Sequence, residues 1–541
     1  MQGKSAKAIR KRASTPQYVS PNQLTLSGFE TPFYQKLTTQ NRWVKMAHAI
    51  PWDKIVGHYD NLFQSTEGRP PISSRVVLGA MIIKHIEDLT DRGTIMHIQE
   101  NMFMQYFLGY SSFTNEEPFS AALFVEIRKR LSLELLSKIN DVIAIHCIKE
   151  NEEYKEQKDD SPSQDESTTI KEDAATNSSS ILSVISPAAI KDEPTALPAA
   201  EEKTTNNNKG KLITDATVAP QNITYPTDLK LLNAAREKSQ ELIDKLYSSK
   251  LHGDTKPRTY RQIARKDFLN TAKKKRKSTK EIYKAIGSQL RYLKRNLGHI
   301  ETLLQAYNKF PLKAREQKYL MVLHTVYQQQ EQMHRTGTKR IDDRIVNIHQ
   351  PYVRPIVRGK EAAKVEFGSK LQVSMVEGFT FIDHLSWDAF NESQYLLTSV
   401  ENYKRRLGFY PAEVLADQIY CTRENRKQLK ALGIKLKAKS LGRPSSTAVA
   451  VDLSPGERNP IEGKFGQAKI AYGLDNIKAK LKETSESWIA SIALVLNLVA
   501  MTRQALASLI MDKYSVLIGW IKFIFYKKET SVLKILAWSS C

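Results

Sequence analysis

The chain contains very little cysteine: three residues in 541, at Cys147, Cys421 and Cys541. They are scattered, odd in number and form no Cys-x-x-Cys pair. This spacing supports neither a disulfide framework nor a zinc site, because both need cysteines at paired or closely spaced positions. A protein without disulfides suits a reducing compartment, so we expect it in the cytoplasm.

Long apolar runs are also missing. No stretch of 18 or more apolar residues occurs, so we expect no membrane-spanning helix. The N-terminus is basic but shows no apolar core or cleavage site, and it does not resemble a signal peptide. The apolar segment Val516–Tyr526 is short and interrupted by Lys522, which favours a packing helix or strand over an interfacial membrane segment. Hydrophobic residues make up 41% of the chain, enough to build buried cores.

Acidic residues are scarce relative to basic ones. The chain has 81 Lys and Arg against 58 Asp and Glu, which gives a formal net charge of +23 and a pI near 9.5. Such an imbalance favours a polyanionic partner, because phosphates attract Lys and Arg and release their counterions. An anionic membrane surface would attract the same charge, but without a spanning segment nucleic acid is the better prediction.

Shifts in composition divide the chain. We expect a flexible basic arm at 1–24, a helical domain at 25–151, a disordered polar linker at 152–210, an α/β domain at 211–510 and a tail at 511–541. The short, punctuated helices of the second segment suit a DNA-binding module, although an all-α dimerisation domain would show the same pattern. Within the α/β domain, a basic helical block at about 228–340 interrupts the pattern.

The α/β segment has an informative order. Leu212–Val218 forms an apolar strand, and after the helical block the period changes towards two from Arg354 onwards. A hairpin turn is predicted at Glu377-Gly378, and helices then alternate with short strands up to a helix that begins near Pro460. This order is that of a ribonuclease-H-like fold with an insertion after its first strand: a strand, inserted helices, two strands, then helix, strand, helix, strand and helix.

Three acids occupy notable positions in these elements: Asp215 in the first strand, Asp417 after a short strand, and Glu462 at a helix start. A carboxylate within an apolar strand is costly unless it is paired or bound to metal. Three carboxylates brought together can share two divalent ions, which activate a nucleophile and stabilise a leaving oxygen at a phosphodiester. Ordinary structural explanations also exist, since Asp215 would cap a turn at Pro220 and Asp417 would cap a helix.

Glu462 has the strongest alternative explanation. In Asn459-Pro460-Ile461-Glu462, the asparagine takes the N-cap position of a helix and the proline its first position. The glutamate takes the third position, where it would complete a capping box. The capping role and a metal role do not exclude each other. Lys469 lies seven residues after Glu462 and returns to nearly the same helix face, where its ammonium group would serve a DNA phosphate.

The basic block contains the densest charge run of the chain: Lys273, Lys274, Lys275, Arg276 and Lys277. A run of this kind is often only the solvated face of a helix. Further basic and aromatic residues nearby favour instead a surface that follows a DNA backbone: Tyr260, Arg261, Arg265, Arg291 and Arg295. We therefore predict DNA contact for the run, with the solvated helix face as the alternative.

The three acid blocks resemble those of a DDE transposase of the bacterial insertion-sequence type, in the transposase-11 group of the insertion-sequence 4/5 superfamily. The block Lys211-Leu-Ile-Thr-Asp215 is similar to the first aspartate block of that family. The block Ala416-Asp-Gln-Ile-Tyr420, with Arg-Glu-Asn-Arg soon after it, is similar to the second. The segment from Phe33 to about Leu133 resembles the amino-terminal domain of these transposases.

The third block resembles the Tyr-Arg-Glu-Lys signature of the same family. Arg458, Glu462 and Lys469 match three of its members at the family's spacing. The tyrosine position falls on Pro455, so the contact made by that tyrosine is not carried over. The departure does not affect the three acids.

The resemblance implies cut-and-join chemistry at the terminal inverted repeats of a mobile element. Asp215, Asp417 and Glu462 would hold two Mg²⁺ or Mn²⁺ ions, and Arg458 and Lys469 would contact DNA phosphates. Cleavage would release a 3′-hydroxyl that attacks double-stranded target DNA, with a homo-oligomer acting on paired ends at the nucleoid and no membrane partner. Two other classes stay open, a ribonuclease-H-like nuclease that cuts without joining and a non-catalytic DNA-binding relic.

Overall fold

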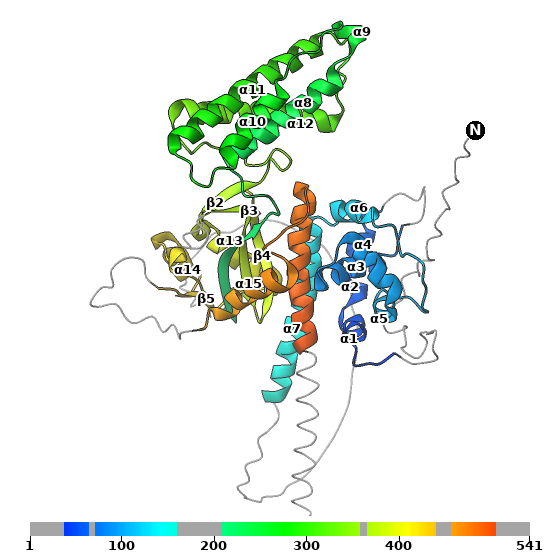
Figure 1. The fold of residues 1–541 in the computed structure, drawn as a ribbon. Helices are drawn as coiled ribbons and strands as arrows, with labels where there is room; N and C mark the ends of the chain where they lie inside the picture. The colour runs from blue at the N-terminus through cyan, green and yellow to red at the C-terminus, as the bar shows by residue number, and fades with distance from the viewer. Residues whose placement is uncertain (1–36, 64–70, 160–206, 358–364, 440–455, 505–541) are drawn as a thin grey trace, which may run out of the picture.

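The computed structural model describes residues 37–63, 71–159, 207–357, 365–439 and 456–504 (Figure 1). They form a helical N-terminal region, a mixed β-sheet, and a helical body inserted into the chain of the sheet. The predicted class, an α/β protein preceded by helices, is therefore confirmed. The arm at 1–24, most of the linker, the tail at 511–541 and Pro455 lie outside the described residues.

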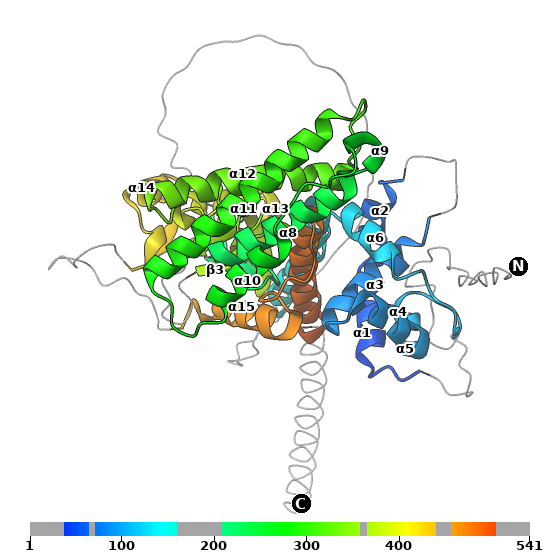
Figure 2. The same ribbon diagram turned by 45° about the horizontal axis from the view of Figure 1, so that its top comes forward.

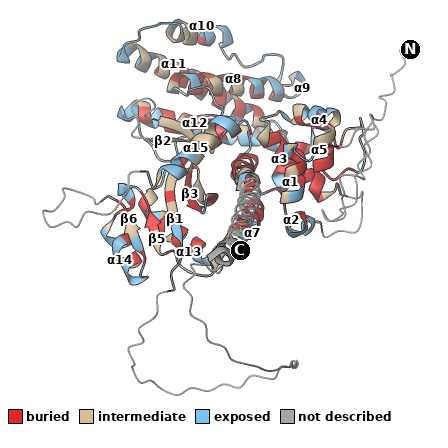
Figure 3. Cartoon of the chain, turned by 90° about the horizontal axis from the view of Figure 1, so that it is seen from below, coloured by how far each residue is buried: buried red, intermediate tan, exposed pale blue. Residues whose placement is uncertain are grey.

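The N-terminal region is built from α1 (Arg42–Ala49), α2 (Trp52–Asp60), α3 (Ser74–Ile86), α4 (Asp91–Glu100), α5 (Met102–Phe107), α6 (Leu123–Arg130) and α7 (Leu133–Asp159). The side chain of Asn41 begins α1 by accepting the N–H of Trp43 at 2.9 Å. The helices bury their inner faces against one another (Figure 3). In this core the rings of Trp52 and Phe107 meet edge to face at 5.4 Å. Because α7 continues to Asp159, residues 152–159 are helical and not part of a disordered linker.

The described strands form one mixed sheet: β1 (Lys211–Pro220), β2 (Arg354–Val357), β3 (Val365–Val376), β4 (Phe379–Ser386), β5 (Glu413–Leu415) and β6 (Lys435–Lys437). The long strand β3 is antiparallel to β1 on one side and to β2 and β4 on the other. Beyond β1, the sheet continues with β5 and β6, both parallel to β1. The main order is therefore β4-β3-β1-β5-β6, with β2 beside the start of β3.

Two short sequence features fix the course of β3. The hairpin into β4 turns at Glu377 and Gly378, which both have left-handed backbone conformations, with φ of 49° and 86°. The hairpin predicted at these residues is confirmed. Near the other end, Gly368 pairs with both β1 and β2, and a Cβ atom there would lie 2.1 Å from the carbonyl oxygen of Ala219. Only glycine allows the strands to approach this closely.

The insertion between β1 and β2 comprises α8 (Asp228–Leu246), α9 (Ser249–His252), α10 (Arg261–Ala272), α11 (Thr279–Gln305) and α12 (Ala314–Thr336). Its long helices pack side by side in a bundle that stands apart from the sheet (Figures 1 and 2). Apolar residues such as Leu232, Leu293 and Leu323 form a core within the bundle that is separate from the core under the sheet. The insertion is therefore a folded body with its own interior.

The C-terminal elements complete the sheet layer: η3 (Glu392–Tyr395), α13 (Leu396–Leu407), η4 (Gln418–Tyr420), α14 (Arg423–Ala431), α15 (Asn459–Tyr472) and a last helix at Lys482–Gln504. By length and composition alone, the last helix is apolar enough to cross a membrane, which we did not expect from the sequence. However, 78% of its most apolar window is buried inside the protein. Packing in the core accounts for its apolar character.

A single hydrophobic core runs from the N-terminal helices into the sheet and the last helix. Polar groups are buried at this junction and satisfy one another. Asn497 of the last helix accepts the N–H of Thr380 in β4 at 2.7 Å and donates to Oδ1 of Asn140 in α7 at 2.9 Å. Asn140 in turn donates to the carbonyl of Thr380 at 3.0 Å. Three segments distant in the sequence are thereby fixed to each other.

An ionic cluster reinforces the same junction. Arg406 of α13 lies 3.1 Å from Oδ1 of Asp141 in α7 and 3.0 Å from Oδ1 of Asp383 in β4. The side chains of Arg406 and Asp383 are 5% and 0% exposed, so this charge pair is buried. The helical N-terminal region and the sheet are therefore joined by apolar, polar and ionic contacts together.

Candidate active site

Asp215 lies in the middle of β1, where one edge of the strand is open. β5 pairs with β1 only along Lys211–Ile213, so in the described chain no strand covers the edge beside Asp215. The side chain is half-buried, and its Oδ1 accepts the N–H of Ala216 at 2.8 Å. Because β1 continues to Pro220, Asp215 does not cap a turn, and that alternative is wrong.

Asp417 lies two residues after the end of β5, and its charge is close enough to raise the pKa of Asp215. It is the N-cap of η4, where its Oδ1 accepts the N–H of Gln418 at 2.7 Å, so the capping explanation for this residue is confirmed. The side chain remains 57% exposed, and its Oδ1 also lies 3.1 Å from Nη1 of Arg458. Asp417 therefore shapes the backbone locally and still presents a carboxylate to its surroundings.

Glu462 lies in the first turn of α15, with its side chain 55% exposed. The capping arrangement predicted for Asn459 is wrong, because Arg458 is the N-cap residue and makes no side-chain cap hydrogen bond. The carboxylate of Glu462 accepts a hydrogen bond from Nη2 of Arg458 at 2.8 Å instead. Helix capping therefore does not explain the presence of this glutamate.

One guanidinium group connects the three acids. Arg458 contacts Asp417 through Nη1 and Glu462 through Nη2, and its charge is close enough to lower the pKa of Asp215. Charge-assisted contacts of this kind are among the stronger hydrogen bonds in proteins. The middle of β1, the end of β5 and the start of α15 therefore meet in one place.

Burial dominates the electrostatics of Asp215. Loss of solvent raises its pKa from 3.8 to about 6, although the N–H of Ala216 and the charge of Arg458 work in the opposite direction. The negative charges of Glu392 and Asp417 add to the rise. For Arg458, burial acts to lower the pKa, but the neighbouring carboxylates outweigh it and raise the pKa. Carboxylates perturbed by burial and by one another are typical of functional sites.

The carboxylates at this site are the type of ligand that a hard divalent cation prefers. Within the described ranges, no three His, Cys, Asp or Glu side chains are gathered closely enough to form a metal site as they stand. However, the guanidinium of Arg458 lies between the acids, so a positive charge is stable at that point. Carboxylate oxygens are the ligands that Mg²⁺ and Mn²⁺ prefer, and a nearby cation would reverse the raised pKa of Asp215.

The structure adds an acid that the sequence did not single out. Glu392 is the first residue of η3, and its Oε1 lies 2.8 Å from Nζ of Lys370 in β3. Its charge raises the pKa of Asp215 and of the buried Tyr420, which places it at the rim of the same site. A single glutamate in a loop forms no sequence pattern, so only the fold could reveal it.

The predicted DNA-contacting residues fall in two regions. Lys469 lies in the last turn of α15, two turns beyond Glu462, as the helical spacing predicted. The run Lys273–Lys277 lies in the insertion, where Lys273 is the C-cap of α10 and the others form an exposed turn before α11. The run is therefore an exposed turn between two helices and not the face of one helix, and its contact with DNA stays a prediction.

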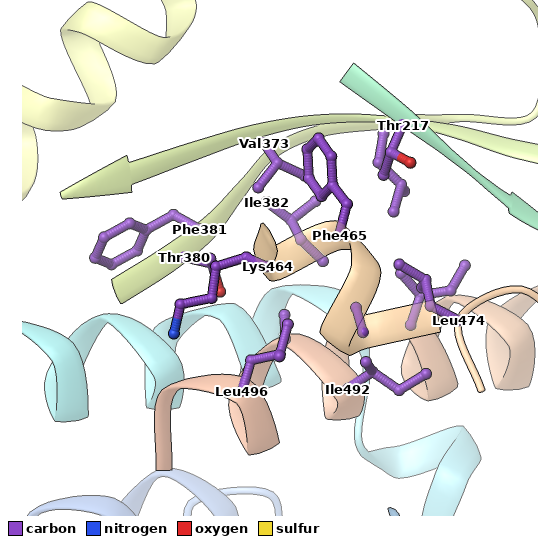
Figure 4. Close-up of a pocket in the computed structure, with 14 residues that line it drawn as sticks. Thr217, Val373, Thr380, Phe381, Ile382, Lys464, Phe465, Leu474, Ile492 and Leu496 are labelled. Carbon is purple, nitrogen blue, oxygen red and sulfur yellow. The ribbon is translucent and has the colours of Figure 1, made fainter. Parts of the chain in front are cut away.

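An apolar pocket lies beneath α15, between the sheet and the last helix (Figure 4). Thr217 and Val373 line it from the strands, and Phe465 lines it from α15. Lys464 is the one charged residue of the lining, and burial lowers its pKa. None of the three acids lines this pocket, so we interpret it as imperfect packing under α15 and not as a substrate site.

The raised pKa of Asp215 leads to a prediction about stability. The folded-state pKa of about 6 exceeds the unfolded value of 3.8, so the stability that the proton supplies is lost as the pH rises from about 4 to about 6. Above pH 6 the buried charge costs up to about 3 kcal/mol. In EDTA, Asp215→Asn should therefore raise the thermal unfolding midpoint at pH 7.5 and leave it nearly unchanged at pH 3.5. Equal shifts at both pH values would show that the carboxylate is not desolvated.

Two parts of the chain match known protein families. Residues 414–499 match the family described as "Transposase DDE domain", and residues 31–130 match the family described as "Transposase domain (DUF772)". Asp417, Arg458 and Glu462 lie inside the first match, whereas Asp215 lies outside it. The N-terminal helices up to α6 coincide with the second.

A Rhizobium meliloti protein with the name "Uncharacterized protein ORF8 in nfe locus" is 29% identical to this chain over 96 residues. The shared stretch covers 18% of this chain and 46% of that protein, so the chain spans about half the length of this relative. No solved structure matches the chain.

Both family matches are to transposase domains, which belong to proteins of mobile elements. The segment that carries Asp417, Arg458 and Glu462 is similar to a transposase DDE domain, and the segment at 31–130 is similar to an N-terminal transposase domain. These matches do not distinguish one insertion-sequence group from another.

Proposed function

We propose that this protein is the DDE transposase of a bacterial insertion sequence in the transposase-11 group. In this proposal it binds the terminal inverted repeats, cleaves the DNA to expose 3′-hydroxyls and joins them to target DNA. The observation that carries the proposal is the pairing of Arg458 with Asp417 and Glu462 beside the open edge of β1, where its charge also acts on Asp215. Two of these acids lie within the transposase DDE match.

The arrangement of the sheet supports the same proposal. A central β1, with β3 antiparallel on one side, β4 antiparallel beyond β3, and β5 and β6 parallel on the other side, is the strand order of a ribonuclease-H-like core. In this arrangement the acids belong to the first strand, the end of a neighbouring strand and a later helix, as proposed for the catalytic set. The helical insertion follows the first strand and leaves the hydrogen bonding between β1 and β3 intact.

The chain's own groups suggest how the chemistry is divided. Asp215, Asp417 and Glu462 would hold two Mg²⁺ or Mn²⁺ ions, which when bound supply nucleophile activation and leaving-group stabilisation. Asp215 is held in place by β1 and by the hydrogen bond from the N–H of Ala216. Arg458 gives up its contacts with the acids to bind a DNA phosphate, and Lys469 binds a phosphate further along α15. The N-terminal helices and a second protomer would hold the paired ends at the nucleoid.

The proposal is tested by reconstituting the reaction. The DNA on both sides of the gene is sequenced, and any inverted repeats are placed on a labelled duplex with purified protein and a target plasmid. We expect Mg²⁺-dependent nicks that expose 3′-hydroxyls at the repeat ends, followed by joined products in the plasmid. Scrambled ends and EDTA serve as controls. Cleavage without joining would support the nuclease alternative, and binding without cleavage would support the DNA-binding relic.

A further inference from the structure

The positive charge of the protein is concentrated in the helical insertion. Residues 228–340 contain 27 Lys and Arg against 10 Asp and Glu. They account for most of the net charge of +23, so the rest of the chain is close to balanced. A body that served only as a spacer would not need this concentration of like charge, which destabilises a compact fold through repulsion.

Within the insertion, the charge is strongest in one helical hairpin. We call residues 258–298, which comprise α10, the following turn and most of α11, the basic hairpin. It contains 14 Lys and Arg and two acids, Asp267 and Glu281. Asp267 accepts a hydrogen bond from the hydroxyl of Tyr292 at 2.8 Å, and Glu281 pairs with Lys274 at 2.5 Å while capping α11. Both acids are engaged locally, so most of the positive charge has no counterpart within the hairpin.

The turn at the tip of the hairpin presents its charges to solvent. Lys275, Arg276 and Lys277 are exposed, and none of them makes an ion pair with another residue that the structure describes. The turn holds its form because Ser278 and Glu281 form a capping box that begins α11. A fixed, unpaired cluster of cations is a favourable partner for several phosphates at once.

The charges continue along α11 on one side of the helix. Lys280, Lys284, Arg291 and Arg295 follow at intervals of four, seven and four residues, which returns them to one face. The opposite face of α11 is buried against the bundle through leucines such as Leu293. With 27 residues, α11 is about 40 Å long, which corresponds to about 12 base pairs of duplex DNA.

A second group of cations marks the other end of the hairpin. The guanidinium groups of Arg258 and Arg295 lie over the ring of Tyr260, 4.7 and 4.3 Å from its centroid. Arg258 is exposed, so its charge is available to a phosphate at this end of the hairpin.

From these observations we propose that the basic hairpin is a surface that binds the phosphate backbone of duplex DNA without regard to sequence, over roughly one helical turn. The proposal rests on the proposed function for the identity of DNA as the partner. The hairpin supplies affinity and holds the duplex, while any choice between sequences is made elsewhere, because phosphate contacts carry no base information.

The test neutralises the tip of the hairpin. Lys275→Gln, Arg276→Gln and Lys277→Gln are combined in the full-length protein, and affinity is measured against salt concentration on repeat-end and random duplexes. The slope of log affinity against log salt should fall by about 2.7, at about 0.9 per lost contact, and equally on both duplexes. Unchanged affinity, or a loss confined to the repeat-end duplex, would overturn the proposal.

A control variant with the same change in net charge tests whether the position of the cations matters. Lys309→Gln, Arg315→Gln and Lys318→Gln remove three exposed cations from the opposite end of the insertion. We expect this variant to retain most of the wild-type slope. If it lost as much affinity as the tip variant, net charge would explain the result and the proposed surface would be wrong. Tighter binding of wild type to vesicles of anionic lipid than to duplex DNA would also overturn it.

The inference and the proposed function fail in different ways. If wild-type protein binds duplex DNA through the basic hairpin but never cleaves it, the hairpin surface stands and the transposase activity does not. If it cleaves and joins repeat ends but the tip variant shows the wild-type salt slope, the proposed function stands and the hairpin surface does not. Circular dichroism of each variant checks that the bundle remains folded.

Discussion

Replacing Asp215 with asparagine should lower the rate of metal-dependent DNA cleavage by about a thousandfold, because a carboxylate that holds a catalytic ion contributes several kcal/mol to the transition state. The substitution keeps the shape of the side chain and the hydrogen bond from Ala216, so the local fold should persist. DNA binding should be unchanged or slightly tighter, since one negative charge is removed. Cleavage is measured in single-turnover reactions and binding on the same duplex.

The other two acids and one control complete this experiment. Asp417→Asn and Glu462→Gln should lose cleavage to a similar degree while retaining binding. Glu483→Gln changes an exposed acid at the start of the last helix, outside the three acid blocks, and should cut at the wild-type rate. If Glu462→Gln cleaves as fast as wild type, Glu462 does not hold an ion and its contact with Arg458 is only structural. Together with the stability gain expected for Asp215→Asn, loss of cleavage would show that stability is given up for activity at this position.

Replacing Arg406 with leucine should destabilise the protein by about 3–5 kcal/mol, because it leaves the buried carboxylate of Asp383 without its cation. Arg406 contacts both Asp141 and Asp383, and the Asp383 side chain is fully buried. The guanidinium also lies 4.2 Å from the centroid of the Phe381 ring, so packing is lost as well. The change is measured as a shift in the urea midpoint, followed by tryptophan fluorescence.

Arg405 provides a matched control for this prediction. It contacts the same Asp141 at 3.0 Å, but its side chain is 60% exposed. Arg405→Leu should cost about 1 kcal/mol or less, because exposed ion pairs gain little over water. Similar losses for Arg405→Leu and Arg406→Leu would mean that burial of Asp383 does not decide the effect.

Local patterns in the sequence predicted much of the fold correctly. The strand predicted at Leu212–Val218 is β1, and the turn at Glu377-Gly378 is the hairpin between β3 and β4. Helices were expected to alternate with short strands after this hairpin, and α13 and α14 do so, on either side of β5. These features are carried by period, turn residues and helix stops within a few neighbours, which is why one sequence is enough to find them.

Features that depend on contacts between distant residues could not be predicted from local sequence patterns. The sequence predicted phosphate contact for Arg458, but its pairing with Asp417 and Glu462 requires β5 and α15 to meet across a long loop. Glu392 reaches the site only because η3 follows β4 at the right place. The core shared by the N-terminal helices and the sheet likewise depends on α7 meeting β4, which no local pattern encodes.

Two chain segments connect the insertion to the sheet, one leaving β1 and one returning to β2, and they contact each other. Asp228 at the start of α8 pairs with Arg344 on the returning segment at 2.5 Å, and Val346, Val353 and Trp387 form a small apolar cluster at the base. A body anchored in this way has a fixed reach from the open edge of β1. A duplex bound to the basic hairpin would therefore reach the acids at a fixed distance from the bound turn. That distance along the DNA would determine which phosphodiester bond lies beside Asp215, Asp417 and Glu462.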